Sequence, residues 1–129
     1  MHRDVSVLIV DDEERFRTTL AKLLGAHGLT VRTAGSGAEA LAALAAEPCQ
    51  VALLDVKMPG MSGIEALAEI KRRAPEVEVI ILTGHASVDA AVEIMRLGGA
   101  DYLLKPCPVE EILDKIGLAV ERRRQRTGG

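Results

Sequence analysis

Short apolar runs alternate with longer stretches of helical spacing along the chain. The runs are rich in β-branched residues, and several are almost continuously apolar, as strands covered on both faces should be. The predicted strands are residues 5–10, 29–34, 51–55, 77–83 and 100–104. Strands that alternate with helices are typical of βαβ units, so the pattern predicts an α/β fold with a parallel sheet.

The stretches that follow these runs repeat apolar residues at the spacing of an amphipathic helix. The apolar positions are Phe16, Leu20, Leu23 and Leu24 in the first stretch, Ile64, Leu67 and Ile70 in the third, Val88, Val92 and Met95 in the fourth, and Val109, Ile112, Leu113, Ile116 and Val120 in the last. The second stretch is rich in alanine. We therefore expect a helix after every strand.

Signals for helix ends agree with this division. Ser36 with Glu39, and Ser62 with Glu65, fit the capping box in which a hydroxyl and a carboxylate each accept from a backbone N–H. Residues that stop helices follow three of the stretches, namely Gly28, Pro75 and the pair Gly98-Gly99.

Composition and length favour one domain with an aliphatic core. The chain has 129 residues, of which 48% are apolar and only 2% aromatic, so the core must be built from Val, Ile, Leu and Ala. The formal net charge of −3 gives no general attraction to nucleic acid or to an anionic membrane. We therefore expect no direct binding of nucleic acid by this domain.

The sequence carries no pattern that predicts export or membrane insertion. Its longest strongly apolar runs, such as residues 51–54 and 79–82, are far too short for a membrane span, and its first residues do not resemble a signal peptide. Cys49 and Cys107 lie far apart without metal-ligand spacing, which favours reduced thiols. We expect a cytoplasmic protein that makes no membrane contact.

Polar residues stand at the carboxyl ends of four predicted strands. They are Asp11 and Asp12 after the first strand, Asp55 at the end of the third, Thr83 at the end of the fourth and Lys105 after the fifth. Ligands of open α/β sheets bind beyond the carboxyl ends of the strands. The spacing therefore predicts one site at this edge.

The chemistry of these side chains indicates a metal and a phosphoryl group. Three carboxylates repel one another unless a cation joins them, and Mg²⁺, with Mn²⁺ as a substitute, prefers such oxygen ligands. Lys105 supplies a positive charge and Thr83 a hydroxyl donor for phosphoryl oxygens. An aspartate is able to act as a nucleophile, and Asp55 lies between the acidic pair and the Thr83–Lys105 pair.

Each of these residues also has an ordinary structural interpretation. Asp11 and Asp12 suit a turn and helix N-cap, Asp55 suits a strand end, Thr83 is common in strands, and Lys105 suits solvent. Their joint placement at one sheet edge favours the functional interpretation over independent structural roles.

Four segments resemble the receiver domain of two-component response regulators. They are residues 7–13 (VLIVDDE), 54–63 (LDVKMPGMSG), 82–85 (LTGH) and 99–106 (GADYLLKP), and the resemblance covers roughly residues 4 to 121. It implies a flavodoxin-like, doubly wound (βα)5 three-layer sandwich whose parallel five-stranded sheet has the order 2-1-3-4-5. Residues 1–121 would form the receiver domain, and residues 122–129 a basic tail or the start of a linker.

The resemblance also assigns roles to residues of this chain. Asp55 would take a phosphoryl group from a phosphohistidine of a sensor histidine kinase or phosphotransfer protein. Asp12, Asp55 and the backbone carbonyl of Lys57 would bind Mg²⁺, and Asp11 would act through a water. Thr83 and Lys105 would contact the phosphoryl oxygens. Such a domain is no enzyme toward other substrates, because it catalyses only its own phosphorylation and dephosphorylation.

A conformational switch is implied by the same family pattern. Thr83 would move toward the phosphate, Tyr102 would fill the space it leaves, and the surface of the fourth helix, fifth strand and fifth helix would change. The bond between Lys105 and Pro106 resembles the family's cis peptide. Lys57 and His85 would line the entrance to the site, although His85 taken alone is better explained as a solvent-facing loop residue than as a catalytic base.

The output and partners of the chain stay open at this level. The segment from residue 83 to 106 is similar to receivers that precede ATP-dependent transcription activators of the nitrogen-regulatory type, and to some that precede helix-turn-helix outputs. No such output domain is present in this chain, so we expect either a stand-alone regulator or the N-terminal piece of a larger one, with an output that is transcriptional. The apolar residues Val88, Val92, Met95 and Leu103 form either a homodimer face or part of the core.

Two other function classes fit the sequence less well. Aspartyl phosphohydrolases that resemble haloacid dehalogenases need an acid two residues after the nucleophile, where this chain has Lys57. A degenerate receiver used only for binding would not need the complete set of acidic pair, nucleophile, threonine and lysine. Nucleotide binding lacks support because no Walker-type loop or GxGxxG is present.

Overall fold

Five parallel strands form one sheet in the order β2-β1-β3-β4-β5 in the computed structural model, which describes residues 5–84 and 87–126. The strands are β1 (Ser6–Val10), β2 (Thr30–Ala34), β3 (Val51–Leu54), β4 (Glu78–Thr83) and β5 (Asp101–Leu104). The helices are α1 (Glu14–Ala26), α2 (Gly37–Ala46), α3 (Gly63–Arg73), α4 (Val88–Arg96) and α5 (Val109–Arg126). This arrangement confirms the predicted doubly wound α/β fold and its strand order.

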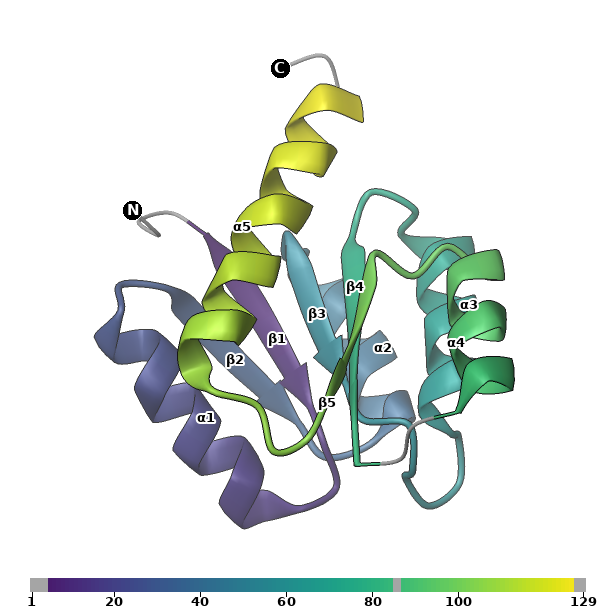
Figure 1. Cartoon of the computed structure of the whole chain (residues 1–129), viewed down its shortest axis with the longest axis horizontal. Coiled ribbons are helices and arrows are strands. Elements are labelled where there is room, and N and C mark those ends of the chain that lie inside the picture. Colours follow the sequence, from purple (N-terminus) through teal and green to yellow (C-terminus); the bar gives the residue numbers. More distant parts are fainter. Residues whose placement is uncertain (1–4, 85–86, 127–129) are drawn as a thin grey trace.

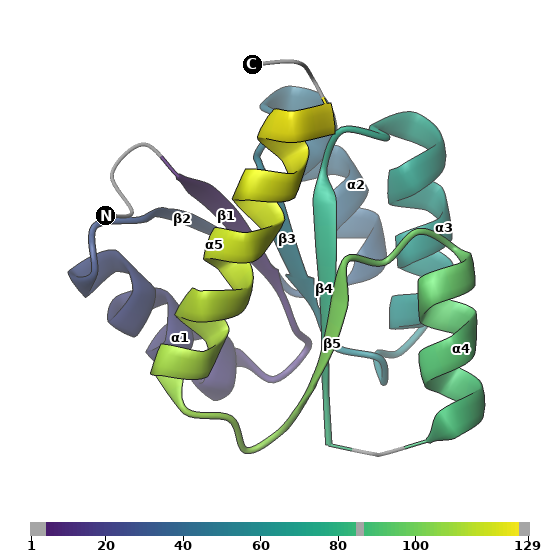
Figure 2. The same ribbon diagram turned by 45° about the horizontal axis from the view of Figure 1, so that its top comes forward.

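Helices cover both faces of the sheet, as Figures 1 and 2 show. Helices α1 and α5 pack on one face over a core that includes Leu24, Leu53 and Ile116, while α2, α3 and α4 pack on the other over Leu54, Leu67 and Ile81. Strand β1 pairs with β2 on one side and with β3 on the other. The chain therefore reverses its winding direction between β1 and β3, which opens a crevice at their carboxyl ends.

The observed elements differ from the predicted ones in small ways. Four strands begin one residue later than predicted, and β3 ends at Leu54. The capping box of Ser62 and Glu65 is complete. At α2 only half of the capping box forms. The Ser36 hydroxyl accepts from the N–H of Glu39, but the Glu39 carboxylate accepts from the N–H of Gly35 instead of that of Ser36.

Helix α4 packs on the sheet through a different side from the one that its spacing suggests. Val88, Val92 and Met95 are 80%, 60% and 54% exposed, whereas Ile94 is completely buried. Leu103 of β5 belongs to the core. Because β5 is the edge strand, α4 covers it over a narrow contact and leaves one apolar stripe in solvent. Leu23 of α1 is likewise 45% exposed, against the predicted pattern.

Gly63 allows α3 to begin directly against the loop that carries Asp55. Its N–H donates to the carbonyl of Val56 at 2.8 Å. A Cβ atom at this position would lie 2.1 Å from the carbonyl oxygen of Asp55 and 2.7 Å from the Cα atom of Val56. Both obstructing atoms belong to the backbone, so a side chain here forces the loop to shift.

We predict that Gly63→Ala lowers the free energy of unfolding by about 1–3 kcal/mol, the usual cost of overpacking a well-packed site. The matched control is Gly117→Ala on α5, where a Cβ meets no atom within 4 Å. The control is expected to be neutral or slightly stabilising, because alanine favours a helix more than glycine does. Urea unfolding of the three proteins measures both effects, and equal stability of Gly63→Ala and the parent would contradict the prediction.

Candidate functional site

Three carboxylates meet at the crevice between β1 and β3. Asp11 and Asp12 directly follow β1, and Asp55 directly follows β3. One oxygen of each side chain lies within 4.8 Å of the others. The N–H of Asp55 donates to the carbonyl of Val10 at 3.0 Å, which holds the two strand ends together. The structure thus brings together the acidic residues that the sequence predicts as one cluster.

Asp11 is buried and held from several directions. Its Oδ1 accepts from the N–H of Glu13 at 2.9 Å, so the turn role considered for this residue is also present. Its Oδ2 accepts from Nζ of Lys105 at 2.7 Å. Its backbone carbonyl accepts from Nη1 of Arg17 at 2.7 Å. Asp12, by contrast, is exposed to solvent.

Lys105 reaches the cluster from the end of β5. Its N–H donates to the carbonyl of Thr83 at 2.7 Å, which aligns the ends of β4 and β5. Its ammonium lies 2.7 Å from Oδ2 of Asp11 and 3.8 Å from Oδ1 of Asp55, and the lysine side chain is only 20% exposed. The peptide bond from Lys105 to Pro106 is cis.

Thr83 and Lys57 border the same region. Thr83 is the last residue of β4 and is 2% exposed. Lys57 is exposed, and its backbone N–H donates a hydrogen bond to the Asp55 carboxylate. His85, which the sequence suggests for the entrance, lies outside the described residues.

The surroundings of Asp55 disfavour its negative charge. Burial is the largest cause and raises the pKa of the Asp55 carboxyl above its ordinary value. The Lys105 ammonium opposes this shift, while the negative charges of Asp11 and Asp12 add to it. The balance leaves the cluster short of positive charge, a condition that a divalent cation relieves.

Tyr102 connects β5 with the start of α4. Its ring packs against the core between the sheet and the α2, α3 and α4 layer. Its hydroxyl accepts a hydrogen bond from the N–H of Ser87 at 3.2 Å. Ser87 is the N-cap of α4, where its own hydroxyl accepts from the N–H of Ala90. A movement of Tyr102 would therefore break a bond at the beginning of α4.

Two residues at the site are missed by the sequence argument. Phe16 lies beneath Lys105, whose Nζ is 4.0 Å from the centre of the ring. Arg17 binds the carbonyl of Asp11. Both follow the acidic pair within one and a half turns of α1, and Phe16 is one of only two aromatic residues in the chain, the other being Tyr102. The scarcity of aromatic residues is the feature of the sequence that could have indicated a special role for Phe16.

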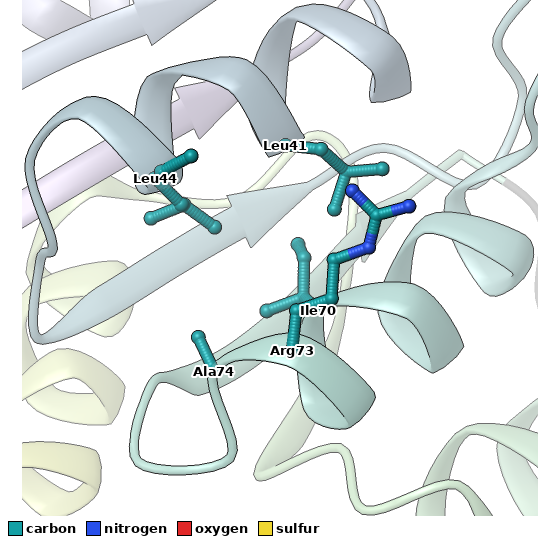
Figure 3. A pocket seen from close by; sticks show the side chains of 6 residues that line it. Leu41, Leu44, Ile70, Arg73 and Ala74 are labelled. Carbon is teal, nitrogen blue, oxygen red and sulfur yellow. The ribbon is translucent and has the colours of Figure 1, made fainter.

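A separate apolar pocket lies between α2 and α3 (Figure 3). It encloses about 150 Å³ and is lined by Leu41, Leu44, Ala45, Ile70, Arg73 and Ala74. Its α3 residues stand near the carboxyl end of that helix, whereas the amino end of α3 meets the Asp55 loop. The pocket offers one guanidinium and no carboxylate, so the acidic cluster remains the candidate site.

Within the described part of the chain, no helix combines the length and the apolar character that a membrane crossing requires.

Comparison with known proteins identifies the family to which the chain is similar. The family model of the response regulator receiver domain matches residues 7–117. The chain is 40% identical over 120 residues to the DNA-binding transcriptional regulator NtrC of Escherichia coli K12, an alignment covering 93% of this chain and 26% of that protein. It is 38% identical over 111 residues to the transcriptional regulatory protein ZraR of the same organism, covering 86% and 25% respectively. The chain thus spans about a quarter of the length of these relatives.

Solved structures share the fold over nearly the whole chain. A response regulator receiver domain protein from Clostridium thermocellum has a TM-score of 0.88 at 35% identity, covering 94% of this chain and 98% of that one. NtrX from Brucella abortus, in complex with ATP, has a TM-score of 0.91 at 30% identity, covering 99% of this chain and 29% of that one. The family match and these likenesses show that the chain belongs to the response-regulator receiver domain family.

Proposed function

We propose that this receiver domain accepts a phosphoryl group on Asp55 from the phosphohistidine of a sensor histidine kinase or phosphotransfer protein. The observation that carries the proposal is the convergence of Asp11, Asp12 and Asp55 with the Lys105 ammonium at one end of the sheet. A carboxylate oxygen of Asp55 forms a bond to phosphorus as the phosphorus–nitrogen bond breaks, and the imidazole leaves with the bonding electrons and takes up a proton. The domain acts on no other substrate, and catalyses only its own phosphorylation and dephosphorylation.

The carboxylates suit Mg²⁺, with Mn²⁺ as a substitute. Both oxygens of Asp11 already accept hydrogen bonds, from Glu13 and Lys105, which favours an indirect role through water. Asp12, Asp55 and the backbone carbonyl of Lys57 would then be the direct ligands. When bound, the metal neutralises charge on the phosphoryl oxygens. An oxygen-only donor set that leaves positions for water and phosphate is typical of Mg²⁺ sites.

Lys105 and Thr83 would hold the transferred group. The Lys105 ammonium is 3.8 Å from Oδ1 of Asp55, so a short movement brings it to an oxygen of a phosphoryl group on that atom. Thr83 ends the neighbouring strand and would donate its hydroxyl to another oxygen.

A signal would leave the site through Thr83 and Tyr102. Movement of Thr83 toward the phosphate would make room for the Tyr102 ring, and that shift would release the Ser87 N–H at the start of α4. The surface of α4, β5 and α5 would then change. Because the relatives NtrC and ZraR are transcriptional regulators, we propose a transcriptional output, carried by a further domain or by a partner, in the cytoplasm.

The exposed stripe on α4 would contact a second copy of the domain. Val88, Val92 and Met95 of α4 and Leu104 of β5 are all at least 46% exposed. Glu93 and Arg96 pair on the same helix. A twofold contact that brings Glu93 of one copy near Arg96 of the other would make this surface complementary to itself.

Removal of the proposed phosphoacceptor tests the proposal directly. Incubation with acetyl phosphate and Mg²⁺ should add the mass of one phosphoryl group to the parent, and Asp55→Asn should reduce labelling to background because it removes the nucleophile. Asp114→Asn, which changes an exposed aspartate on α5, is the control and should label normally. Intact-mass spectrometry with mapping of the modified residue measures both. Labelling of Asp55→Asn at the parent rate, or no adduct on folded parent protein, would refute the proposal.

Charge repulsion at Asp55 leads to a separate prediction. The pKa of Asp55 is raised in the folded protein, so its ionised form costs stability at any pH above that value, and the cost disappears as the pH falls and the carboxyl takes up a proton. Asp55→Asn should therefore raise Tm at neutral pH in chelator. Mg²⁺ at ten times its Kd should stabilise the parent by about 1.4 kcal/mol, and the variant less.

Differential scanning calorimetry with and without Mg²⁺ measures these shifts, and Asp114→Asn again serves as the control. A lower Tm for Asp55→Asn in chelator would contradict the repulsion, and an absent Mg²⁺ response in the parent would contradict the metal site.

Contact with a second copy of the domain leads to another prediction. Acetyl phosphate with Mg²⁺ should shift the parent toward a dimer in sedimentation velocity, and Val92→Glu should hold the protein as a monomer because it places like charges in the contact. Leu23→Glu alters a similarly exposed apolar residue on α1 and should leave dimerisation intact. A phosphorylated parent that stays monomeric, or a Val92→Glu variant that dimerises equally well, would rule out this surface.

A further inference from the structure

The face of the Phe16 ring supports the Lys105 ammonium. Nζ of Lys105 lies 4.0 Å from the ring centre, well inside the range of a cation–π interaction. Phe16 is partly buried and packs against the core between the sheet and the α1 and α5 layer. The ring is thus packed against the core, and the lysine ammonium lies over its face.

Among the residues that the structure describes, the Lys105 ammonium has three partners of two kinds. Two are carboxylates, Asp11 at 2.7 Å and Asp55 at 3.8 Å, and the third is the neutral ring. The lysine side chain is only 20% exposed, and a cation–π contact becomes stronger when water is kept away from it. The ring therefore contributes more here than it would on an open surface.

The two kinds of partner respond differently when the site is loaded. A divalent cation bound at the cluster would compete with the ammonium for the negative charges of Asp11 and Asp55. Phosphoryl transfer would turn the Asp55 oxygen into part of an acyl phosphate. Both events weaken the hold of the carboxylates on the ammonium. The attraction to the ring face does not depend on those charges, and it tolerates small movements across the face, because it lacks the strict direction of a hydrogen bond.

We propose that Phe16 is a positioning residue for phosphoryl transfer, which keeps the Lys105 ammonium beside Asp55 while the carboxylates change their charge. This inference rests on the proposed function of Asp55. Lysine has a flexible four-carbon stem, and holding its charge in place beforehand lowers the entropy lost when it meets the phosphoryl oxygens. The alternative is that Phe16 only fills space in the core, a role that leucine or methionine performs equally well.

Variants at this position separate the two roles. Phe16→Leu and Phe16→Met keep an apolar side chain but remove the ring, and they should slow phosphorylation by acetyl phosphate at saturating Mg²⁺ by about three- to tenfold. Phe16→Tyr and Phe16→Trp keep a π face and should stay within about twofold of the parent. Leu20→Met, a conservative change one turn further along α1 in the same core, is the control and should leave the rate unchanged. Urea unfolding identifies any variant whose fold is damaged.

A double-mutant cycle shows whether Phe16 acts through Lys105. In the Lys105→Met background, which retains no ammonium, Phe16→Leu should cause no further loss of rate. The chain has no tryptophan, so Phe16→Trp also provides a single fluorescent probe beside the lysine. Its emission should change when beryllofluoride and Mg²⁺ are added, and Lys105→Met should remove most of that change.

These outcomes distinguish the inference about Phe16 from the proposed function of Asp55 on which it rests. If the parent is not phosphorylated, the proposed function fails. If the parent is phosphorylated and Phe16→Leu is as fast, or if the loss persists unchanged in the Lys105→Met background, Phe16 is core filling and this inference alone is overturned. A rate that falls equally in the tyrosine and leucine variants would overturn it as well.

Discussion

Repulsion among three carboxylates is the constraint on which the organisation of this domain depends. Backbone pairing of β1 with β3 brings carboxylate oxygens of Asp11, Asp12 and Asp55 within 4.8 Å of one another. Among the described residues, the ammonium of Lys105 lies against this cluster. A fold that forces like charges together must stabilise them by other means. Here the sheet supplies the rigid frame, and the metal and phosphoryl group that we propose would relieve the repulsion within the cluster.

The sheet is most tightly packed at the strands that carry the residues of the candidate site. Strands β3 and β4 are buried along their whole length, so the ends that carry Asp55 and Thr83 have little freedom. Gly63 lets α3 begin against the Asp55 loop, and the guanidinium of Arg17 holds the backbone of the Asp11 turn. Catalytic groups held by packed elements keep their geometry without loss of entropy when a substrate arrives.

The opposite holds for α4, through which a signal would leave. Only Ile94 among its residues is fully buried, and its first turn is tied to β5 by the bond between Ser87 and Tyr102. Few buried contacts allow an element to shift at a small cost in free energy. Helix α5 is fastened more firmly, since Arg122 and Arg123 donate to the carbonyls of Ala100 and Glu76 and the helix continues to Arg126.

The sequence by itself determined the order of elements and the composition of the site. Alternating periodicity depends on local geometry, so each strand was located to within a residue at either end, and the parallel arrangement then required Asp11, Asp55 and Lys105 to share one edge. Only the tertiary structure decided which side of α4 faces the core, that Glu39 binds Gly35, and that Phe16 lies beneath Lys105. These contacts join side chains through space, and their outcome depends on packing at an edge strand and on how distant elements meet, which no local spacing encodes.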